Sequence, residues 1–254
     1  MRITILDLQP IIQKQKGTAY WQAALSRCQD GRQLLAVLGQ FANYSAEFAG
    51  CVAILAGIVA LKNDWFAGRS QNVASPIFRA AVDEFSPECT HAELAHRTLA
   101  ACMVHFRIDA VGAASLMGPT PATVEVTAAS RSGYAATVNP EKISPEALFE
   151  AIGFHLSSEM LAAEEFRFLD SALCLDHPQL VVVLIAQDVY TWVELHTHVE
   201  MIHLSAAYDA ANRAIECSVV LPPDKARDSI LRGFERFADM HTRFFRKLAE
   251  GESR

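Results

Sequence analysis

Three residues in the second half of the chain have the types and the spacing that suit a metal site. They form the pattern His-x-x-x-Glu-x-x-His, with His196, Glu200 and His203 at positions i, i+4 and i+7. Successive residues of an α-helix lie about 100° apart around its axis, so all three side chains fall within about 60° of one another. Val193 lies on the same face, whereas His198 points the opposite way. The three candidate ligands are therefore predicted to lie in the middle of an apolar helix face.

The segment 145–174 carries a second inward acidic group. If this segment is helical, Glu159 lies in the middle of its apolar stripe, and His155 lies about 40° from Glu159, one turn earlier. The neighbouring Glu164 and Glu165 lie about 140° and 240° away from Glu159. We therefore predict that Glu159 points inward, that His155 is a borderline inward group, and that Glu164 and Glu165 point outward.

A third inward imidazole is predicted in the segment 87–106. His91 lies within about 50° of the centre of its apolar stripe, and Glu88 shares that face. Glu84 would share the face as well if the helix continued backwards past Pro87, but a proline makes that continuity uncertain. The sequence leaves open whether Glu84 or Glu88 acts together with His91.

Inward acids on separate helices require a compensating charge. An ionised carboxylate buried among apolar side chains costs several kcal/mol unless it is paired, and these stripes contain no Lys or Arg near their centres. Three carboxylates with three neutral imidazoles carry −3, which two divalent ions would change to about +1. A mixed set of oxygen and imidazole ligands suits iron or manganese better than structural zinc. A single inward His or Glu usually has an ordinary polar partner. The metal hypothesis therefore rests on the combination of inward His and Glu side chains on three predicted helices.

One all-helical arrangement that fits is the ferritin-like bundle. It takes a Glu from each of two helices and a Glu-x-x-His from each of two others. The sequence supplies such a set in the required order, namely Glu47, Glu88, His91, Glu159, Glu200 and His203. This arrangement leaves His196 pointing inward without a partner.

A second arrangement uses His196 as well, and here the sequence resembles the heme-oxygenase-like diiron oxidases. The resemblance rests on the segments AAVDEFSPECTHAEL (80–94), HLSSEMLAAEEFRFL (155–169) and VELHTHVEMIHL (193–204), and it covers roughly residues 20–215. The chain departs from the family pattern at Glu200, where the family usually has Asp, and at Pro87. Carried over by position, the resemblance implies six metal ligands: Glu84, His91, Glu159, His196, Glu200 and His203.

This resemblance also implies an activity. Two iron ions that cycle between Fe(II) and Fe(III) would use O2 as co-substrate to oxidise a small carboxylate or an amino acid. The outcomes implied are oxidative C–C cleavage, decarboxylation, desaturation or N-oxygenation in natural-product biosynthesis. The ligands would divide so that Glu159 approaches both ions, with Glu84 and His91 on one iron and His196, Glu200 and His203 on the other. No catalytic residue beyond these ligands is predicted.

Three further residues are candidates for substrate binding. Trp192 and Phe166 would line an apolar pocket, although both also fit an ordinary core. Arg167 lies about 80° from Glu159 on the helix and would suit a substrate carboxylate. The alternative for Arg167 is a salt bridge on the helix flank with Glu164, three residues earlier.

The elements that position these residues are predicted to be helices. Pro and Gly are sparse, and Ser86-Pro87 and Ser144-Pro145 each place an N-cap residue before a Pro at the first helical position. The segment 112–140 is rich in Gly, Ala, Ser, Thr and Pro and is predicted to be a connection or flap, with an extended piece at 123–127. Helices are predicted at about 18–39, 42–63, 75–85, 87–106, 145–174, 178–215 (with a break) and 223–250. We expect one all-α domain over residues 1–254, a single heme-oxygenase-like helical bundle of about seven helices.

Composition narrows the class of protein. The 254 residues include 22 Lys plus Arg and 29 Asp plus Glu, a net charge of −7, and 51% are hydrophobic. These values exclude a disordered chain and argue against a nucleic-acid partner. The six cysteines form no C-x-x-C pair and are predicted to be reduced thiols.

The remaining expectations concern location and partners. No signal peptide is predicted, and the longest uncharged apolar run, 48–61, is shorter than the roughly 20 residues that span a bilayer. A buried core helix is the better interpretation of that run, and a cytoplasmic location with no membrane partner is predicted. The expected partner is a small-molecule substrate, with a homodimer left open. The alternative class is a metal-free helical binding protein whose polar stripe closes on itself by hydrogen bonds.

Overall fold

The computed structural model describes residues 2–85 and 89–251. Within these ranges the chain forms α-helices and one short 3-10 helix at Asn63–Phe66, and no strand is present there. The α-helices are α1 (Ile5–Lys14), α2 (Gly17–Ser26), α3 (Gly31–Leu61), α4 (Ser70–Glu84), α5 (His91–Phe106), α6 (Ala110–Met117), α7 (Pro121–Gly133), α8 (Pro145–Asp176), α9 (Pro178–Ala186), α10 (Thr191–Cys217) and α11 (Pro223–Glu250). The predicted all-α class is confirmed, but the eleven α-helices found within residues 2–85 and 89–251 exceed the predicted number of about seven.

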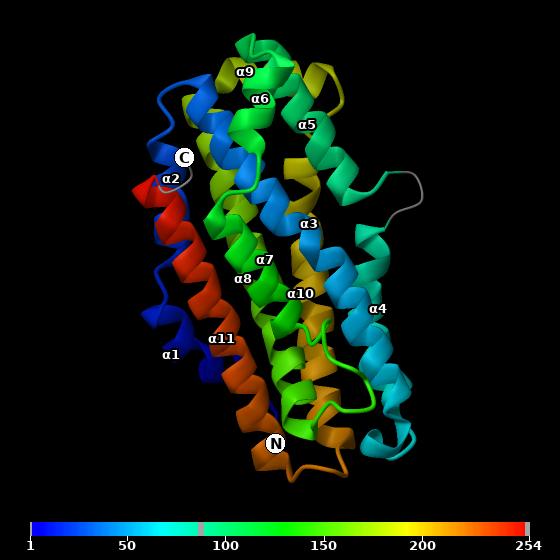
Figure 1. Ribbon diagram of the computed structural model, residues 1–254. Helices are drawn as coiled ribbons and strands as arrows, with labels where there is room; N and C mark the ends of the chain where they lie inside the picture. Colours follow the sequence, from blue (N-terminus) through cyan, green and yellow to red (C-terminus); the bar gives the residue numbers. More distant parts are fainter. Residues whose placement is uncertain (1, 86–88, 252–254) are drawn as a thin grey trace.

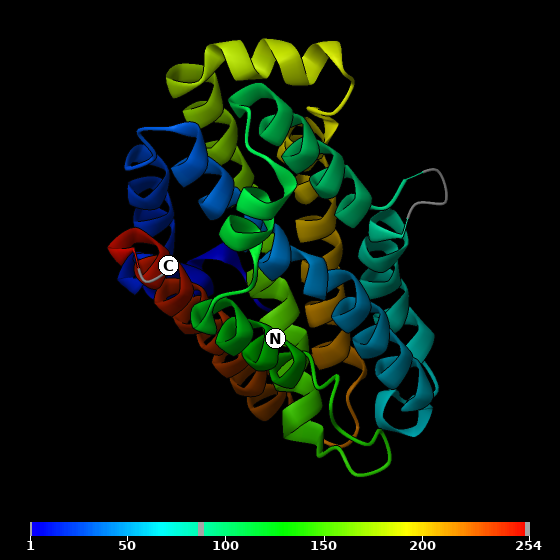
Figure 2. The same cartoon turned by 45° about the horizontal axis from the view of Figure 1, so that its top comes forward.

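Helix α8 lies at the centre of the bundle. It packs against α11 on one side and against α10 on the other, and the three run alongside one another in Figure 1. Helix α3 crosses the front of the bundle and packs against α4, α5, α6 and α7. Helix α9 is bent by 109° from α8 and closes one end of the molecule (Figure 2). Because α8 has neighbours on opposite sides, much of its circumference is buried.

The segment 112–140 differs from its prediction. It contains the helices α6 and α7 in place of an irregular flap, and residues 123–127 are helical rather than extended. Thr120 accepts a hydrogen bond from the backbone N–H of Thr123, and Pro121 occupies the first turn of α7. This is the same Ser/Thr-Pro start that predicts α8 at Ser144, where the cap is confirmed. The local capping signal outweighs the Gly- and Ser-rich composition.

The other predicted helices differ mainly in their ends. The boundary predicted between the helices 18–39 and 42–63 is wrong, because α3 runs unbroken from Gly31 to Leu61. Its N-cap residue, Asp30, accepts hydrogen bonds from two backbone N–H groups. The predicted break in 178–215 is confirmed between α9 and α10, and the helix predicted at 223–250 is confirmed as α11. Helix α1 was not predicted, and the cap proposed at Ser86-Pro87 lies outside the described residues.

By length and composition alone, α3 is apolar enough to cross a membrane, a test that the core helix of a soluble protein also passes. In the structure Phe41, Leu55 and Val59 of α3 are fully buried in the hydrophobic core. One face of the run 48–61 is therefore buried in the core as predicted, whereas Ile54 and Leu61 of the same run are exposed.

Two glycines let α8 and α11 approach to backbone contact. A Cβ atom on Gly153 of α8 would lie 1.8 Å from the carbonyl oxygen of Ile230, and one on Gly233 of α11 would lie 1.8 Å from that of Glu150. No side chain fits at either position without moving a backbone. The reciprocal contact fixes where α11 crosses α8 and hence the register between the two helices.

Replacing Gly233 with alanine is expected to lower the free energy of unfolding by about 2 kcal/mol, because the added methyl group overlaps a backbone carbonyl that must shift. Gly57→Ala is the matched control. Gly57 lies in α3 with nothing within 4 Å of its ideal Cβ, so alanine should raise stability by up to about 1 kcal/mol. Urea denaturation measures both changes, and equal effects of the two substitutions would contradict the close crossing.

Candidate metal centre

The structure brings the six predicted metal ligands into two groups of three. The first group consists of Glu84, His91 and His196, and the second consists of Glu159, Glu200 and His203. Within each group, one potential ligand atom from every residue lies within 4.8 Å of the others. The side chains come from four helices, α4, α5, α8 and α10, so the site depends on the packing of the whole bundle.

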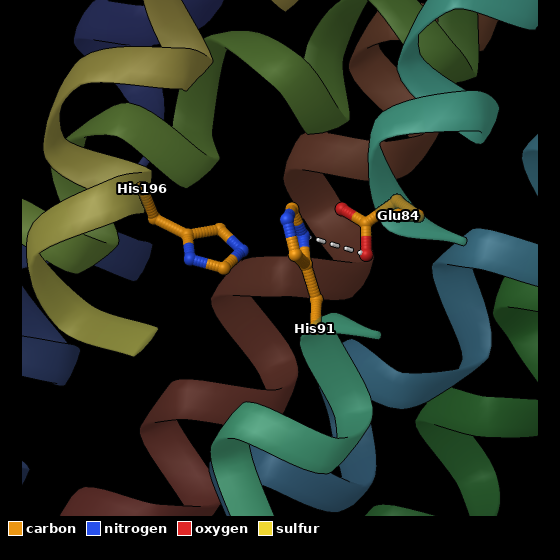
Figure 3. A group of neighbouring side chains, drawn as sticks. All are labelled: Glu84, His91 and His196. Carbon is orange, nitrogen blue, oxygen red and sulfur yellow. Dashed lines mark ion pairs between the residues drawn. The ribbon is translucent and has the colours of Figure 1, made fainter. Parts of the chain in front are cut away.

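The first group lies where α4 ends and α5 begins, opposite α10 (Figure 3). Nδ1 of His91 lies 3.0 Å from Oε2 of Glu84 but lacks hydrogen-bond geometry, and this buried nitrogen has no hydrogen-bond partner. The ring centres of His91 and His196 are 4.4 Å apart. Nδ1–H of His196 donates to the carbonyl oxygen of Trp192 at 2.6 Å, which leaves Nε2 as the nitrogen with a free lone pair.

The second group has two carboxylates and one imidazole. Nδ1 of His203 lies 3.6 Å from Oε2 of Glu159 and 3.8 Å from Oε2 of Glu200. Oε2 of Glu200 is buried without a hydrogen-bond partner. On α8, His155 is fully buried with its Nδ1 3.2 Å from Oε1 of Glu159, so the predicted borderline group does point inward.

Asp83 is a functional candidate that the sequence did not reveal. Nε2–H of His203 donates to Oδ2 of Asp83 at 2.9 Å, so Nδ1 is the nitrogen that faces Glu159 and Glu200. A carboxylate behind a ligating histidine fixes its tautomer and its ring orientation. The side chain of Asp83 is 40% exposed, and no apolar stripe marks it in the sequence.

The division between the two groups differs from the one that the family resemblance implies. His196 lies with Glu84 and His91, not with Glu200 and His203, because it precedes Glu200 by a full helical turn and faces the start of α5. Glu84 therefore accompanies His91 in the structure. Glu88, the other candidate, lies outside the described residues.

Burial and neighbouring titratable groups shift the pKa values of these side chains. Burial, aided by the neighbouring His91, lowers the pKa of His196 to about 3. Burial together with the charges of Glu159 and Glu84 raises the pKa of Glu200 well above its usual value. Burial also opposes ionisation of Glu159, but the adjoining His203 and His155 rings outweigh it and hold the pKa of that carboxyl below its usual value.

The pKa of His203 is shifted in the opposite direction to that of His196. Burial favours its neutral form, yet the contacts with Glu159 and Asp83 raise its pKa to about 9. Without a bound cation, His203 is therefore charged at pH 7, and the raised pKa of Glu200 favours its protonated form. The cluster holds protons in positions where a metal ion would need free ligand atoms.

Both groups open onto one cavity of about 330 Å³, which is at the lower end of the range for small-molecule sites. Its lining includes all of the first group together with Glu159 and Glu200. The apolar part of the wall is formed by Ala46, Phe48, Ala49 and Val52 of α3, Ala80 of α4, Ala162 and Phe166 of α8 and Trp192 of α10.

The three residues predicted to bind substrate have different positions. Phe166 and Trp192 line the cavity, and the ring of Phe166 stacks on His196 with centres 4.0 Å apart. Arg167 does not reach the cavity. Its side chain is 64% exposed and forms an ion pair with Glu164 at 2.6 Å, so the structure shows the salt bridge that was its alternative.

The ferritin-like ligand set loses one member. Glu47 forms a double ion pair with Arg131 of α7, at 2.8 and 3.0 Å, because it lies on the side of α3 that faces α7. It is not a ligand in either group. The ferritin-like arrangement left His196 pointing inward without a partner. In the structure His196 lies with Glu84 and His91.

The prediction that Glu165 points outward is wrong. Glu165 is 2% exposed, lines the cavity, and lies 2.8 Å from Nε2 of the buried His241 on α11. Helix α8 is buried against α11 as well as α10, so a single apolar stripe does not describe its inward positions. His241 lies among buried residues such as Phe237 and Phe244 of the same helix, and the spacing test applied to 196–203 would have found it.

The ligand set fits a pair of iron ions. Two imidazoles with one carboxylate in the first group form the set typical of non-heme Fe(II) sites with open positions, and the second group adds two carboxylates and an imidazole. The orphaned nitrogen of His91 and the orphaned oxygen of Glu200 are buried atoms for which a cation supplies the missing partner.

No protein-family model matches this chain, and comparison with curated proteins and with solved structures finds no match either. The heme-oxygenase-like fold and the diiron oxidase activity implied by the resemblance therefore remain predictions. The two groups of ligand-type side chains are the observation on which the function must be argued.

Removal of the Asp83 carboxylate should weaken metal binding without unfolding the protein. We expect Asp83→Ala to lower the affinity for Mn(II) or Fe(II) about 10- to 100-fold, because His203 then loses its fixed tautomer. Competition with a coloured chelator measures the affinity. The control is Asp209→Ala, which removes an exposed partner of Arg213 on the same helix as His203 and should leave the affinity unchanged. Equal losses in the two variants would contradict the role of Asp83.

Metal binding should release protons. Metal ligands bind in their deprotonated forms, so His203 with its pKa of about 9 must lose a proton when an ion binds at pH 7. The raised pKa of Glu200 acts in the same direction. We expect at least about one proton released per chain at pH 7, and an affinity that rises steeply from pH 6 to pH 8. Titration calorimetry in buffers of different ionisation enthalpy measures the release. An affinity independent of pH would contradict these assignments.

Proposed function

We propose that the protein is an O2-activating non-heme diiron oxidase that acts on a small organic substrate. The observation that carries the proposal is the convergence of six ligand-type side chains from four helices in two adjacent groups, five of which line one apolar-walled cavity. Glu84, His91 and His196 would hold one iron, and Glu159, Glu200 and His203 the other. When bound, such an iron pair supplies the binding and reduction of O2, which allows oxidation of an unreactive C–H bond or of an amine nitrogen.

The chain's own part is to present ligand atoms in fixed directions. The carbonyl oxygen of Trp192 holds the Nδ1–H of His196, and Asp83 holds the Nε2–H of His203. Each of these two imidazoles therefore turns one defined ring nitrogen towards its group, and neither ring needs to rotate when the ion binds. Three protein ligands for each ion leave coordination positions for O2.

The cavity walls supply the second requirement, which is the exclusion of water. Phe48 and Val52 of α3 form apolar parts of the wall together with Phe166 of α8 and Trp192 of α10. Stacking of Phe166 on His196 also fixes that ring against rotation. A dry pocket beside the ligands protects a reactive oxidant from side reactions and leaves room for an apolar substrate.

A metal-free binding protein explains the site less well. In that alternative the buried polar side chains satisfy one another by hydrogen bonds. Within the described residues, however, Nδ1 of His91, Oε2 of Glu200 and both ring nitrogens of His155 are buried and have no hydrogen-bond partner. Unsatisfied buried polar atoms are costly and uncommon, and two of these belong to the ligand groups, where a bound cation would supply the missing partner.

Iron binding and O2 reaction test the proposal together. Protein purified without oxygen should bind about two Fe(II) per chain, one for each group, and should give a transient visible absorption when O2 is admitted. His196→Ala removes a ligand of the first group and should lower the bound iron by about half or more and abolish the absorption.

The matched control is His198→Ala. His198 lies on the same helix two residues away, is exposed, and should behave as wild type. Glu159→Gln paired with the exposed Glu164→Gln repeats the comparison on α8. If His196→Ala and Glu159→Gln bind iron as well as their controls do, the ligand assignment is wrong. A chain that binds iron but never reacts with O2 would contradict the oxidase.

A further inference from the structure

One buried carboxylate in the cavity belongs to neither ligand group. Glu165 lies on α8, six residues after Glu159, and its side chain is 3% exposed. It lines the same cavity as both groups, next to Phe166 and Trp192. A carboxylate in such a position requires a compensating partner.

Two side chains contact Glu165. The hydroxyl of Tyr44 donates to Oε1 at 3.3 Å, and Nε2 of His241 lies 2.8 Å from the same oxygen. Neither ring nitrogen of His241 has a hydrogen-bond partner with good geometry, and Nδ1 faces the backbone of α2 at Gly17. Both contacts to Glu165 are made at Oε1, and among the described residues Oε2 has no hydrogen-bond partner.

The cavity offers no other cation to Glu165. Among its lining residues in the described ranges none is a Lys or an Arg, and Arg167 points into solvent. Glu84, Glu159 and Glu200 have their own cations in the proposed function, on which this inference rests. Glu165 is the acidic group of the cavity that belongs to neither iron site, and His241 contacts only its Oε1.

We propose that Glu165 binds the ammonium group of the substrate, so that the cavity takes a small apolar molecule with a protonated primary amine. The remainder of the substrate lies against Phe48, Val52 and Trp192, within about 330 Å³. Of the two substrate classes that the sequence suggested, an amino acid satisfies this recognition through its amine, and a simple carboxylate does not. Glu165 is thus a specificity-determining residue, positioned by Tyr44 and His241.

The test compares isosteric probes that differ in one polar group. Hexylamine (protonated at pH 7), 1-hexanol and hexanoate are titrated calorimetrically into the Zn(II)-loaded protein, since zinc occupies the ligand groups without redox chemistry. We expect hexylamine to bind about 10- to 100-fold more tightly than 1-hexanol, the range for a hydrogen bond between charged groups. Stronger binding of hexanoate than of hexylamine would overturn the proposal.

The variant Glu165→Gln removes the charge and keeps the shape. It should lower the hexylamine affinity about tenfold or more, leave the 1-hexanol affinity unchanged, and bind as much zinc as wild type. Glu164→Gln, its exposed neighbour, is the matched control and should change none of these. Full hexylamine affinity in Glu165→Gln would mean that the amine binds the metal or another carboxylate, and would overturn the assignment.

Two features keep the outcome separate from that of the proposed function. The readout is binding rather than turnover, so absence of O2 chemistry leaves the amine comparison valid, and absence of an amine preference leaves the diiron assignment standing. If Glu165→Gln does not fold, the comparison of hexylamine with 1-hexanol on wild-type protein still decides, because equal affinities exclude an ammonium site.

Discussion

The constraint on which the structure depends is electrostatic. Within the described residues the buried set contains Glu159, Glu165 and Glu200, together with five histidines, and neither Lys nor Arg. A core of this kind cannot be neutral and dry unless cations come from outside the chain or protons occupy its carboxylates and imidazoles. The raised pKa of Glu200 shows the proton-bearing alternative, and the grouping of the ligands shows where external cations would lie.

Much of the ligand set could be predicted from the sequence, because the direction of a side chain around a helix is a local property. His196, Glu200 and His203 share one face by spacing alone, and all three are buried as predicted. The pairing of His196 with His91 could not be predicted, since it depends on how α5 meets α10. Asp83 was missed because a partly exposed residue at a helix end carries no periodic signal.

The errors in the fold have similarly specific causes. Composition predicts an irregular segment at 112–140, yet Thr120 followed by Pro121 is a helix start as clear as Ser144 followed by Pro145. Glu165 was assigned to solvent because one apolar stripe was assumed for α8. A central helix with neighbours on opposite sides has two inward faces, and only the tertiary arrangement reveals the second one.

The glycine crossing of α8 and α11 has a consequence for recognising relatives of this chain. Gly153, Glu159 and Glu165 follow one another at intervals of six on one helix whose position is fixed at the glycine. One inserted residue between them would turn the next carboxylate by about 100° and shift it by about 1.5 Å, away from the cavity. Insertions therefore cannot accumulate here, and the signature Gly-x5-Glu-x5-Glu, followed downstream by His-x3-Glu-x2-His, should persist where overall sequence similarity has faded.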